Sequence, residues 1–179
     1  SGSRRPDNNE IHNGADDNAS GVSVMMKLAE EFSKSHSNNR SLVFVGFGAE
    51  EMGLWGSKYF VKSNIIDNDN IQIMINMDMV GRLDKKEKII SIGGTHTAVG
   101  LESEIETIIS KSNLKHSFSP EGYGPSDHSS FYVSDIPVLF FFTGAHSDYH
   151  TPEDDAEKIN YRGMKSISQL IYSIADHFS

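Results

Sequence analysis

The chain has 179 residues, of which 37% are hydrophobic, so it is long enough for one compact core and short for two. Its 25 acidic residues outnumber its 16 basic residues and give a net charge of −9, which argues against nucleic acid or an anionic membrane as the main partner. The sequence has no cysteine, which excludes disulfides and thiolate zinc sites, and no apolar stretch is long enough to span a bilayer.

The first half of the sequence predicts one helix and one central strand. Residues 1–10 are polar and loop-like, and we interpret them as a cut made inside a larger protein or as a remnant of cloning. Apolar residues then recur at helical spacing and predict an amphipathic helix from about Ser20 to Lys34. The continuous apolar run from Leu42 to Phe47 predicts a fully buried strand, which is followed by the adjacent carboxylates Glu50 and Glu51.

The rest of the sequence alternates between helices and strands. The predicted elements are a short helix over Ser57–Lys62, strands over Ile71–Asp78 and Lys88–Ile92, a helix over Leu101–Asn113, a strand over Pro137–Phe142 and a final helix from about Asn160 to Phe178. Strands that alternate with helices predict a layered α/β sandwich. We found no linker or internal repeat, so we expect a single domain over residues 1–179.

Acidic and histidine side chains follow several of the predicted strands and turns. Neighbouring glutamates such as Glu50 and Glu51 repel each other unless they share a cation or one is protonated. A bare pair of this kind is most simply a solvated acidic turn, but other candidate ligands accompany it: Asp16, Asp17, Asp78, His146 and His150. Carboxylate oxygen and imidazole nitrogen together suit zinc or a related divalent ion. The pattern therefore indicates a metal site with a carboxylate base.

Five motifs in this sequence occur in the order and at the separations of a known family. They are Gly14–Gly21 (GADDNASG), Ala49–Ser57 (AEEMGLWGS), Asn76–Arg82 (NMDMVGR), Ser126–His128 (SDH) and Tyr149–Pro152 (YHTP). With them the chain resembles the co-catalytic di-zinc exopeptidases, which include bacterial aminopeptidases, glutamate carboxypeptidase and, more distantly, glutaminyl cyclase. The resemblance runs from about Ile11 to the C-terminus. It implies a three-layer α/β sandwich with a mixed central sheet flanked by helices.

The resemblance also implies a set of metal ligands. Asp17 matches the carboxylate that bridges both metals in the family, and the peptide bond between Asp17 and Asn18 is expected to be cis. Glu51 and His150 match the other ligands of one zinc. Asp78 matches a ligand of the second zinc.

Further matches concern proton transfer, the oxyanion donor and residues that support the site. Glu50 matches the general base that takes a proton from the attacking water. Two tyrosines, Tyr123 and Tyr149, are rival matches for the donor that stabilises the oxyanion. Asp127 and His128 match residues that support the site or cap a helix rather than ligands.

One family motif is missing from this sequence. A His-x-Asp motif normally supplies the remaining ligand of the zinc that Asp78 binds, and His12, the only histidine upstream of Asp17, has Gly14 where the aspartate would stand. We therefore expect a catalytic-domain fragment that lacks the N-terminal strands and this motif. We expect it to hold one zinc or none in place of two, to have little activity alone, and to associate with itself through an exposed region of the sheet.

The resemblance predicts a zinc-dependent exopeptidase that acts on peptides. An aminopeptidase is favoured over a carboxypeptidase because the chain has only five arginines, and only Arg82 adjoins the site motifs. A glutaminyl-cyclase-like acyltransferase with a single zinc and a non-catalytic binding domain on the same fold are the alternatives. The resemblance alone favours a protein that is exported or secreted.

Overall fold

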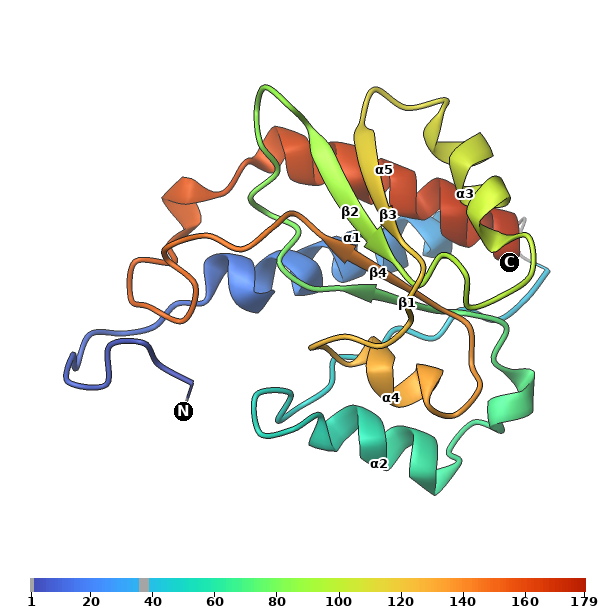
Figure 1. Cartoon of the computed structure of the whole chain (residues 1–179), viewed down its shortest axis with the longest axis horizontal. Coiled ribbons are helices and arrows are strands. Elements are labelled where there is room, and N and C mark those ends of the chain that lie inside the picture. The colour runs from blue at the N-terminus through green and yellow to red at the C-terminus, as the bar shows by residue number, and fades with distance from the viewer. Residues whose placement is uncertain (1, 36–38) are drawn as a thin grey trace.

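The computed structural model describes residues 2–35 and 39–179, and a four-stranded sheet forms its centre (Figure 1). The strands are β1 (Met74–Met77), β2 (Ile89–Gly93), β3 (Lys115–Ser119) and β4 (Val138–Phe142), in the order β1-β4-β2-β3. β4 runs parallel to β1 and antiparallel to β2, and β2 runs parallel to β3. The prediction of a mixed sheet is confirmed.

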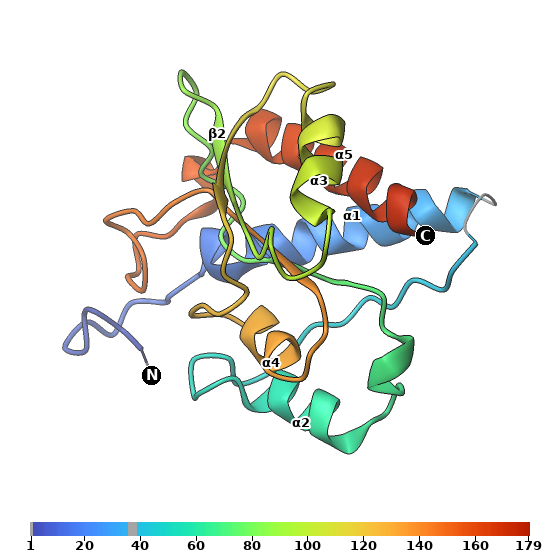
Figure 2. The same cartoon turned by 45° about the vertical axis from the view of Figure 1, so that its right-hand side comes forward.

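Helices cover both faces of this sheet (Figures 1 and 2). The helices α1 (Gly21–Lys34), α3 (Leu101–Ile109) and α5 (Tyr161–Phe178) pack on one face, and α2 (Trp55–Ser63) and α4 (His128–Tyr132) pack on the other. Short helical turns at Asn68–Asn70 and Ala156–Lys158 lie in the connections. The predicted three-layer sandwich is therefore confirmed. No helix among the described residues is long and apolar enough to cross a membrane.

The alternation of side chains along β4 divides the core in two. Leu139 and Phe141 are fully buried and belong to the large cluster beneath α1, α3 and α5. Val138, on the opposite face, belongs to the smaller cluster under α2 and α4, together with Val61 and Phe131. Successive residues of a strand point to opposite faces, so one apolar strand can serve both layers.

The long helices follow directly from sequence spacing. In α1, Val24, Leu28 and Phe32 recur every four residues and are all buried on the face toward the sheet. In α5, Asn160 precedes the first turn and its side-chain oxygen accepts a hydrogen bond from the Gly163 N–H at 3.0 Å. Both helices begin within one residue of their predicted starts.

The predicted buried strand at Leu42–Phe47 is wrong as stated. This segment makes no backbone hydrogen bond to any described residue, and the side chains of Val43 and Phe44 are 58% and 40% exposed. The apolar run indicates residues that favour burial, but a strand also needs a neighbouring strand with which to pair. Across from this segment lies a cavity instead.

Two elements were missed and two are shorter than predicted. β3 alternates polar residues along Lys115–Ser119, because it is an edge strand that pairs with β2 alone. α4 has only five residues, too few for a periodic pattern. β1 pairs only over Met74–Met77, and α3 ends at Ile109.

Candidate metal centre and active site

The predicted site residues converge at one end of the sheet. Asp78 directly follows β1, and Glu50 and Glu51 lie in the turn that leads to α2. Asp17 lies in the tight turn Ala15–Ser20 before α1. These four carboxylates line one end of a cavity of about 850 Å³. The carboxyl end of a strand in an α/β sheet is the usual location of a ligand site.

Asp17, Glu51 and His150 form a three-ligand group. His150 Nε2 lies 3.0 Å from Asp17 Oδ2 and 2.7 Å from Glu51 Oε1, and one ligand atom from each residue lies within 4.8 Å of the others. Zinc takes carboxylate oxygen and imidazole nitrogen at about 2.0–2.2 Å, so ligand atoms around one tetrahedral ion are separated by roughly 3.3 Å. The spacing of this group therefore suits a single zinc ion.

The hydrogen bonds of His150 explain why this group needs a cation. Nδ1 lies 2.7 Å from the carbonyl oxygen of Gly2, which can only accept, so Nδ1 carries the ring proton and donates it. In a neutral imidazole Nε2 then presents a lone pair to the carboxylates of Asp17 and Glu51. Only a proton or a metal ion between them removes this repulsion. Ligating histidines commonly fix their tautomer through such a bond.

The pKa values of Glu50 and Asp78 are both raised well above the ordinary range of carboxylates. Burial, and then the nearby charge of Asp78, raise the pKa of Glu50 to about 7. Burial likewise raises the pKa of Asp78 to about 6, against a hydrogen bond of 2.7 Å that Ser126 donates to its Oδ2. Asp78 Oδ1 is buried without a hydrogen-bond partner. Within residues 2–35 and 39–179, however, Asp78 lies outside the three-ligand group.

The two candidate tyrosines differ in position. The ring of Tyr149 stacks on His150 with 3.7 Å between ring centroids, and Arg4 lies 5.0 Å from the Tyr149 centroid. Burial and the charges of the site carboxylates, led by Glu51, raise the pKa of Tyr149 to about 12, so its hydroxyl remains a donor at neutral pH. Tyr123 is 72% exposed. The structure therefore brings Tyr149 into contact with the ligand His150.

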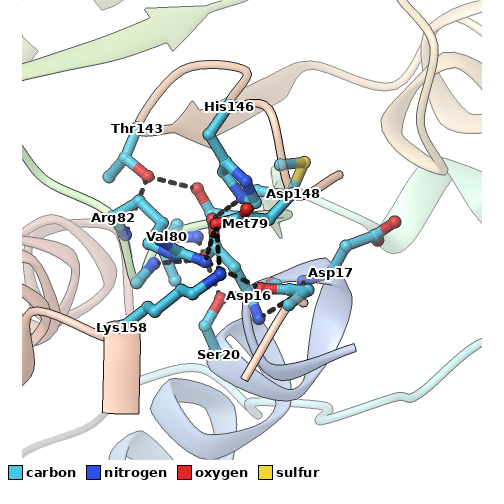
Figure 3. Close-up of polar contacts among 12 residues, drawn as sticks. Asp16, Asp17, Ser20, Met79, Val80, Arg82, Thr143, His146, Asp148 and Lys158 are labelled. Atoms are coloured by element: carbon cyan, nitrogen blue, oxygen red, sulfur yellow. Dashed lines mark hydrogen bonds and ion pairs between the residues drawn. The ribbon is translucent and has the colours of Figure 1, made fainter. Parts of the chain in front are cut away.

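Behind the ligands lies a buried polar network that the sequence did not reveal (Figure 3). Asp154 Oδ2 accepts hydrogen bonds from the backbone N–H groups of Asp16 and Asp17 at 2.9 and 3.0 Å. The Arg82 guanidinium binds both Asp154, at 3.2 Å, and Asp148, at 3.0 Å. This network fixes the backbone at Asp17. Its only sequence signal is that Asp154 follows the Tyr149–Pro152 motif by two residues.

Asp16 and His146 support the site rather than join the three-ligand group. His146 Nε2 lies 3.1 Å from Asp16 Oδ2, while Asp16 Oδ1 accepts a hydrogen bond of 2.7 Å from the Gly81 N–H. The side chain of Asp16 is fully buried. Asp16 therefore ties the turn before α1 to the segments that follow β1 and β4.

The turn Ala15–Ser20 has the backbone that the family match predicts. The Asp17–Asn18 peptide bond is cis, which confirms that prediction. The Asn18 amide donates to the Met77 carbonyl at 2.9 Å and accepts from the Gly21 N–H at 3.1 Å. It thereby joins the end of β1 to the start of α1, with Asp17 beside that junction.

Three site segments contain a non-glycine residue in the left-handed region. Ala49 has φ of 57°, Met79 has 56° and His150 has 58°. Such conformations cost on the order of 1–3 kcal/mol each and persist where the surroundings enforce them, often at functional sites. They lie next to Glu50, next to Asp78 and on a ligand itself.

The remaining histidine and aspartate candidates lie outside the three-ligand group. His12 is hydrogen-bonded to the Ser3 hydroxyl at 2.8 Å and to the Glu10 carbonyl at 3.1 Å. His128 stacks on Phe140 with 4.4 Å between ring centroids, and burial lowers its pKa to about 4, so it is neutral. Asp127 precedes α4, but its side chain makes no capping hydrogen bond.

Comparison with known proteins identifies the lineage of this site. The model of peptidase family M28 matches residues 5–175. The chain belongs to this family. The resemblance inferred from the five motifs is therefore confirmed.

Aminopeptidases recur among the curated relatives of the M28 chain. Aminopeptidase YwaD of Bacillus subtilis is 30% identical over 88% of the chain, and the leupeptin-inactivating enzyme 1 of Streptomyces exfoliatus is 29% identical over 91%. The chain spans 36% of the length of each of these two relatives.

Solved structures give the same picture for the fold of the M28 chain. The LapA aminopeptidase of Legionella pneumophila superposes with a TM-score of 0.79 at 29% identity, over 90% of this chain and 46% of that one. The zinc aminopeptidase BSAP of Bacillus subtilis superposes with a TM-score of 0.78 at 29% identity, over 90% and 41%. The glutaminyl cyclase of Porphyromonas gingivalis, at 17% identity and a TM-score of 0.71 over 93% and 64%, shares the fold.

Proposed function

We propose that this M28 chain carries the active site of a zinc-dependent aminopeptidase, which removes N-terminal residues from peptides. The observation that carries the proposal is the three-ligand group Asp17, Glu51 and His150. Glu50 is adjacent to Glu51 in the chain and lines the same cavity as Asp17 and Glu51. The aminopeptidases among the relatives support the same activity.

The residues of the site suit peptide hydrolysis in distinct ways. Zinc held by Asp17, Glu51 and His150 would act as a Lewis acid on the scissile carbonyl and make water more acidic. Glu50 accepts a proton from the attacking water and returns it to the leaving amine, a task that suits a carboxyl whose pKa is about 7. Tyr149, still protonated, donates a hydrogen bond to the oxyanion.

The position of Arg82 favours an aminopeptidase over a carboxypeptidase. A carboxypeptidase needs a cation free to bind the substrate carboxylate, commonly an arginine fork. The Arg82 guanidinium is instead engaged by Asp148 and Asp154 and is 16% exposed. It serves the structure behind the ligands, and its charge is already balanced.

We further propose that this chain holds one zinc tightly. The three-ligand group leaves an open position for water or substrate, as catalytic zinc sites do. Among the residues that the structure describes, Asp78 belongs to no group of three ligands, whereas zinc sites normally take three or four protein ligands.

Two substitutions separate the roles of the paired glutamates. Glu50→Gln should keep the zinc and lower kcat on an aminoacyl chromogenic substrate by on the order of 10²–10⁴, the usual contribution of a positioned general base. Glu51→Gln should lose the zinc. Activity is measured on the full-length protein. Zinc content is measured on the 179-residue chain. Loss of zinc from Glu50→Gln with retention by Glu51→Gln would reverse the assignment.

The same samples distinguish the alternative functions. A glutaminyl cyclase would convert an N-terminal glutaminyl peptide to its cyclic product and leave other aminoacyl substrates intact. A binding domain would hold zinc and turn over neither substrate. Hydrolysis of the aminoacyl substrate that depends on Glu50 supports the aminopeptidase against both.

A further inference from the structure

The first residues that the structure describes lie against the three-ligand group, beside the loop that carries His150 (Figures 1 and 2). The Gly2 carbonyl oxygen accepts a hydrogen bond from His150 Nδ1 at 2.7 Å, and the Arg4 N–H donates to the His150 carbonyl oxygen at 2.9 Å. A Cβ on Gly2 would lie 2.8 Å from His150 Nδ1 and 2.9 Å from Glu51 Oε2, so only a residue without a side chain permits this approach. Two hydrogen bonds to one ligand therefore hold the backbone of Arg4 beside the site.

The Arg4 guanidinium lies over the Tyr149 ring and has no counter-ion in the described chain. Its Cζ lies 5.0 Å from the Tyr149 centroid, and Tyr149 in turn stacks on His150. Within residues 2–35 and 39–179, Arg4 forms no ion pair and its guanidinium donates no hydrogen bond. A cation–π contact orients a guanidinium, but it leaves the charge unbalanced and the N–H fork free to bind a ligand.

Two other arginines near the site are engaged in ion pairs. Arg5 Nη1 lies 3.8 Å from a carboxylate oxygen of Glu153, and the Arg82 guanidinium binds Asp148 and Asp154. Arg82 is also largely buried, whereas Arg4 is exposed. Of these three arginines, Arg4 is therefore the one whose fork can receive a carboxylate from a substrate.

The charges of the site require such a cation if a substrate carboxylate is to bind. Asp17 and Glu51 would balance the two charges of one zinc ion. Glu50 and Asp78 line the same cavity, and in their ionised forms they attract the ammonium group of a peptide and repel its carboxylate. Arg4 supplies the opposite charge. The site thus offers complementary charges to the two ends of a short zwitterionic peptide.

The distances limit the length of this peptide. The two stacking contacts and a zinc–nitrogen bond of about 2.0–2.1 Å place the Arg4 guanidinium within roughly 12 Å of a zinc ion on His150. One residue spans at most about 3.6 Å, and a hydrogen bond between arginine and carboxylate adds about 2.7–2.9 Å. A carboxylate that lies one or two residues beyond the zinc-bound carbonyl therefore reaches Arg4.

We propose that Arg4 binds the C-terminal carboxylate of short peptides, so that dipeptides and tripeptides are the preferred substrates of this site. The inference rests on the proposed aminopeptidase function and names its substrate class. A dipeptide has a single peptide bond, so release of its N-terminal residue and recognition of its C-terminus concern the same bond. A carboxylate anchor at this distance is therefore compatible with an aminopeptidase.

The test compares leucyl-alanine with leucyl-alaninamide, which lacks the terminal carboxylate. Binding is measured by calorimetry on the zinc-loaded full-length protein with Glu50→Gln, so that hydrolysis does not interfere. We expect Arg4→Gln to lower the ratio of the two affinities, dipeptide over amide, by about 10–100-fold, the usual range for a hydrogen bond to a charged group. Arg4→Lys keeps the charge without the fork and should give an intermediate loss.

Arg5→Gln provides the matched control, because it removes the same group from the adjacent residue. It should leave the affinity ratio at the value of the parent protein. Zinc content should be equal in all variants, because Arg4 contacts His150 through its backbone. The same ratio in Arg4→Gln and Arg5→Gln would overturn the inference, and so would a loss in Arg4→Gln that affects the dipeptide and the amide alike.

Chromogenic substrates separate this inference from the proposed function. Turnover of a leucyl chromogenic substrate, which has no carboxylate, by the protein with Glu50 intact tests the peptidase function alone. Its absence would overturn that function, while the affinity ratio would still test Arg4. A glutamyl and glutaminyl pair tests the other source of a carboxylate. A preference for the glutamyl substrate that Arg4→Gln abolishes would assign Arg4 to an acidic N-terminal side chain and overturn the C-terminal assignment.

Discussion

Asp154→Ala tests whether the buried network behind the ligands fixes the site. Asp154 is 1% exposed, and its loss removes the acceptor for the N–H groups of Asp16 and Asp17 and one of the two carboxylates that bind Arg82. A buried donor without a partner costs about 1–3 kcal/mol, and breaking a buried ion pair costs about 3–5 kcal/mol. Arg82 keeps Asp148, so we expect a total loss of about 2–5 kcal/mol in the free energy of unfolding.

The same substitution should weaken zinc binding, since Asp17 loses the anchor of its backbone. Loss of a group that orients a metal ligand typically costs about 10–100-fold in affinity. Urea unfolding of the metal-free chain gives the stability, and a zinc titration gives the affinity. Asp155→Ala is the matched control, because the Asp155 side chain accepts a surface hydrogen bond of 2.7 Å from the Asn13 amide and lies outside the buried network. If Asp154→Ala matched this control in both measurements, the network would have no positioning role.

Three other substitutions probe separate parts of the structure. The folded-state pKa of His128 is about 4 against an ordinary 6.5, so between these pH values the unfolded chain binds more protons than the folded chain. The free energy of unfolding therefore falls as pH falls through this range. His128→Phe should make the fall in the free energy of urea unfolding between pH 7 and 4 smaller by roughly 3 kcal/mol. An equal pH dependence in both proteins would refute this. Tyr149→Phe should lower kcat by about 10²–10³, and Tyr123→Phe should leave it nearly unchanged; the reverse order would give the donor role to Tyr123. Asn160→Ala should reduce the free energy of unfolding by about 0.5–2 kcal/mol through loss of the α5 cap, and thermal melts that coincide with the wild type would contradict the capping geometry.

Periodic apolar patterns predicted the elements whose burial is repeated and local. The spacing of Val24, Leu28 and Phe32 defines the inner face of α1, and the apolar run of β4 reflects a strand covered on both faces. For the site, position-by-position matching to the family identified Asp17, Glu51 and His150, which the structure brings together.

Neither the lack of strand pairing between Leu42–Phe47 and the rest of the described chain nor the network around Arg82 could be predicted in this way. An apolar run indicates that a segment favours burial, but it does not identify the strand with which it pairs. Arg82 and Asp154 are 72 positions apart, and no local pattern links an arginine after one strand to an aspartate in a distant loop. Both features arise from tertiary contacts.

The zinc content of the 179-residue chain after dialysis tests the central claim most directly. Our account predicts one zinc per chain in the wild type and in His12→Ala, because His12 lies outside the three-ligand group, and none in His150→Ala. Two tightly held zinc ions in the wild type, or zinc that His150→Ala retains and His12→Ala loses, would contradict it.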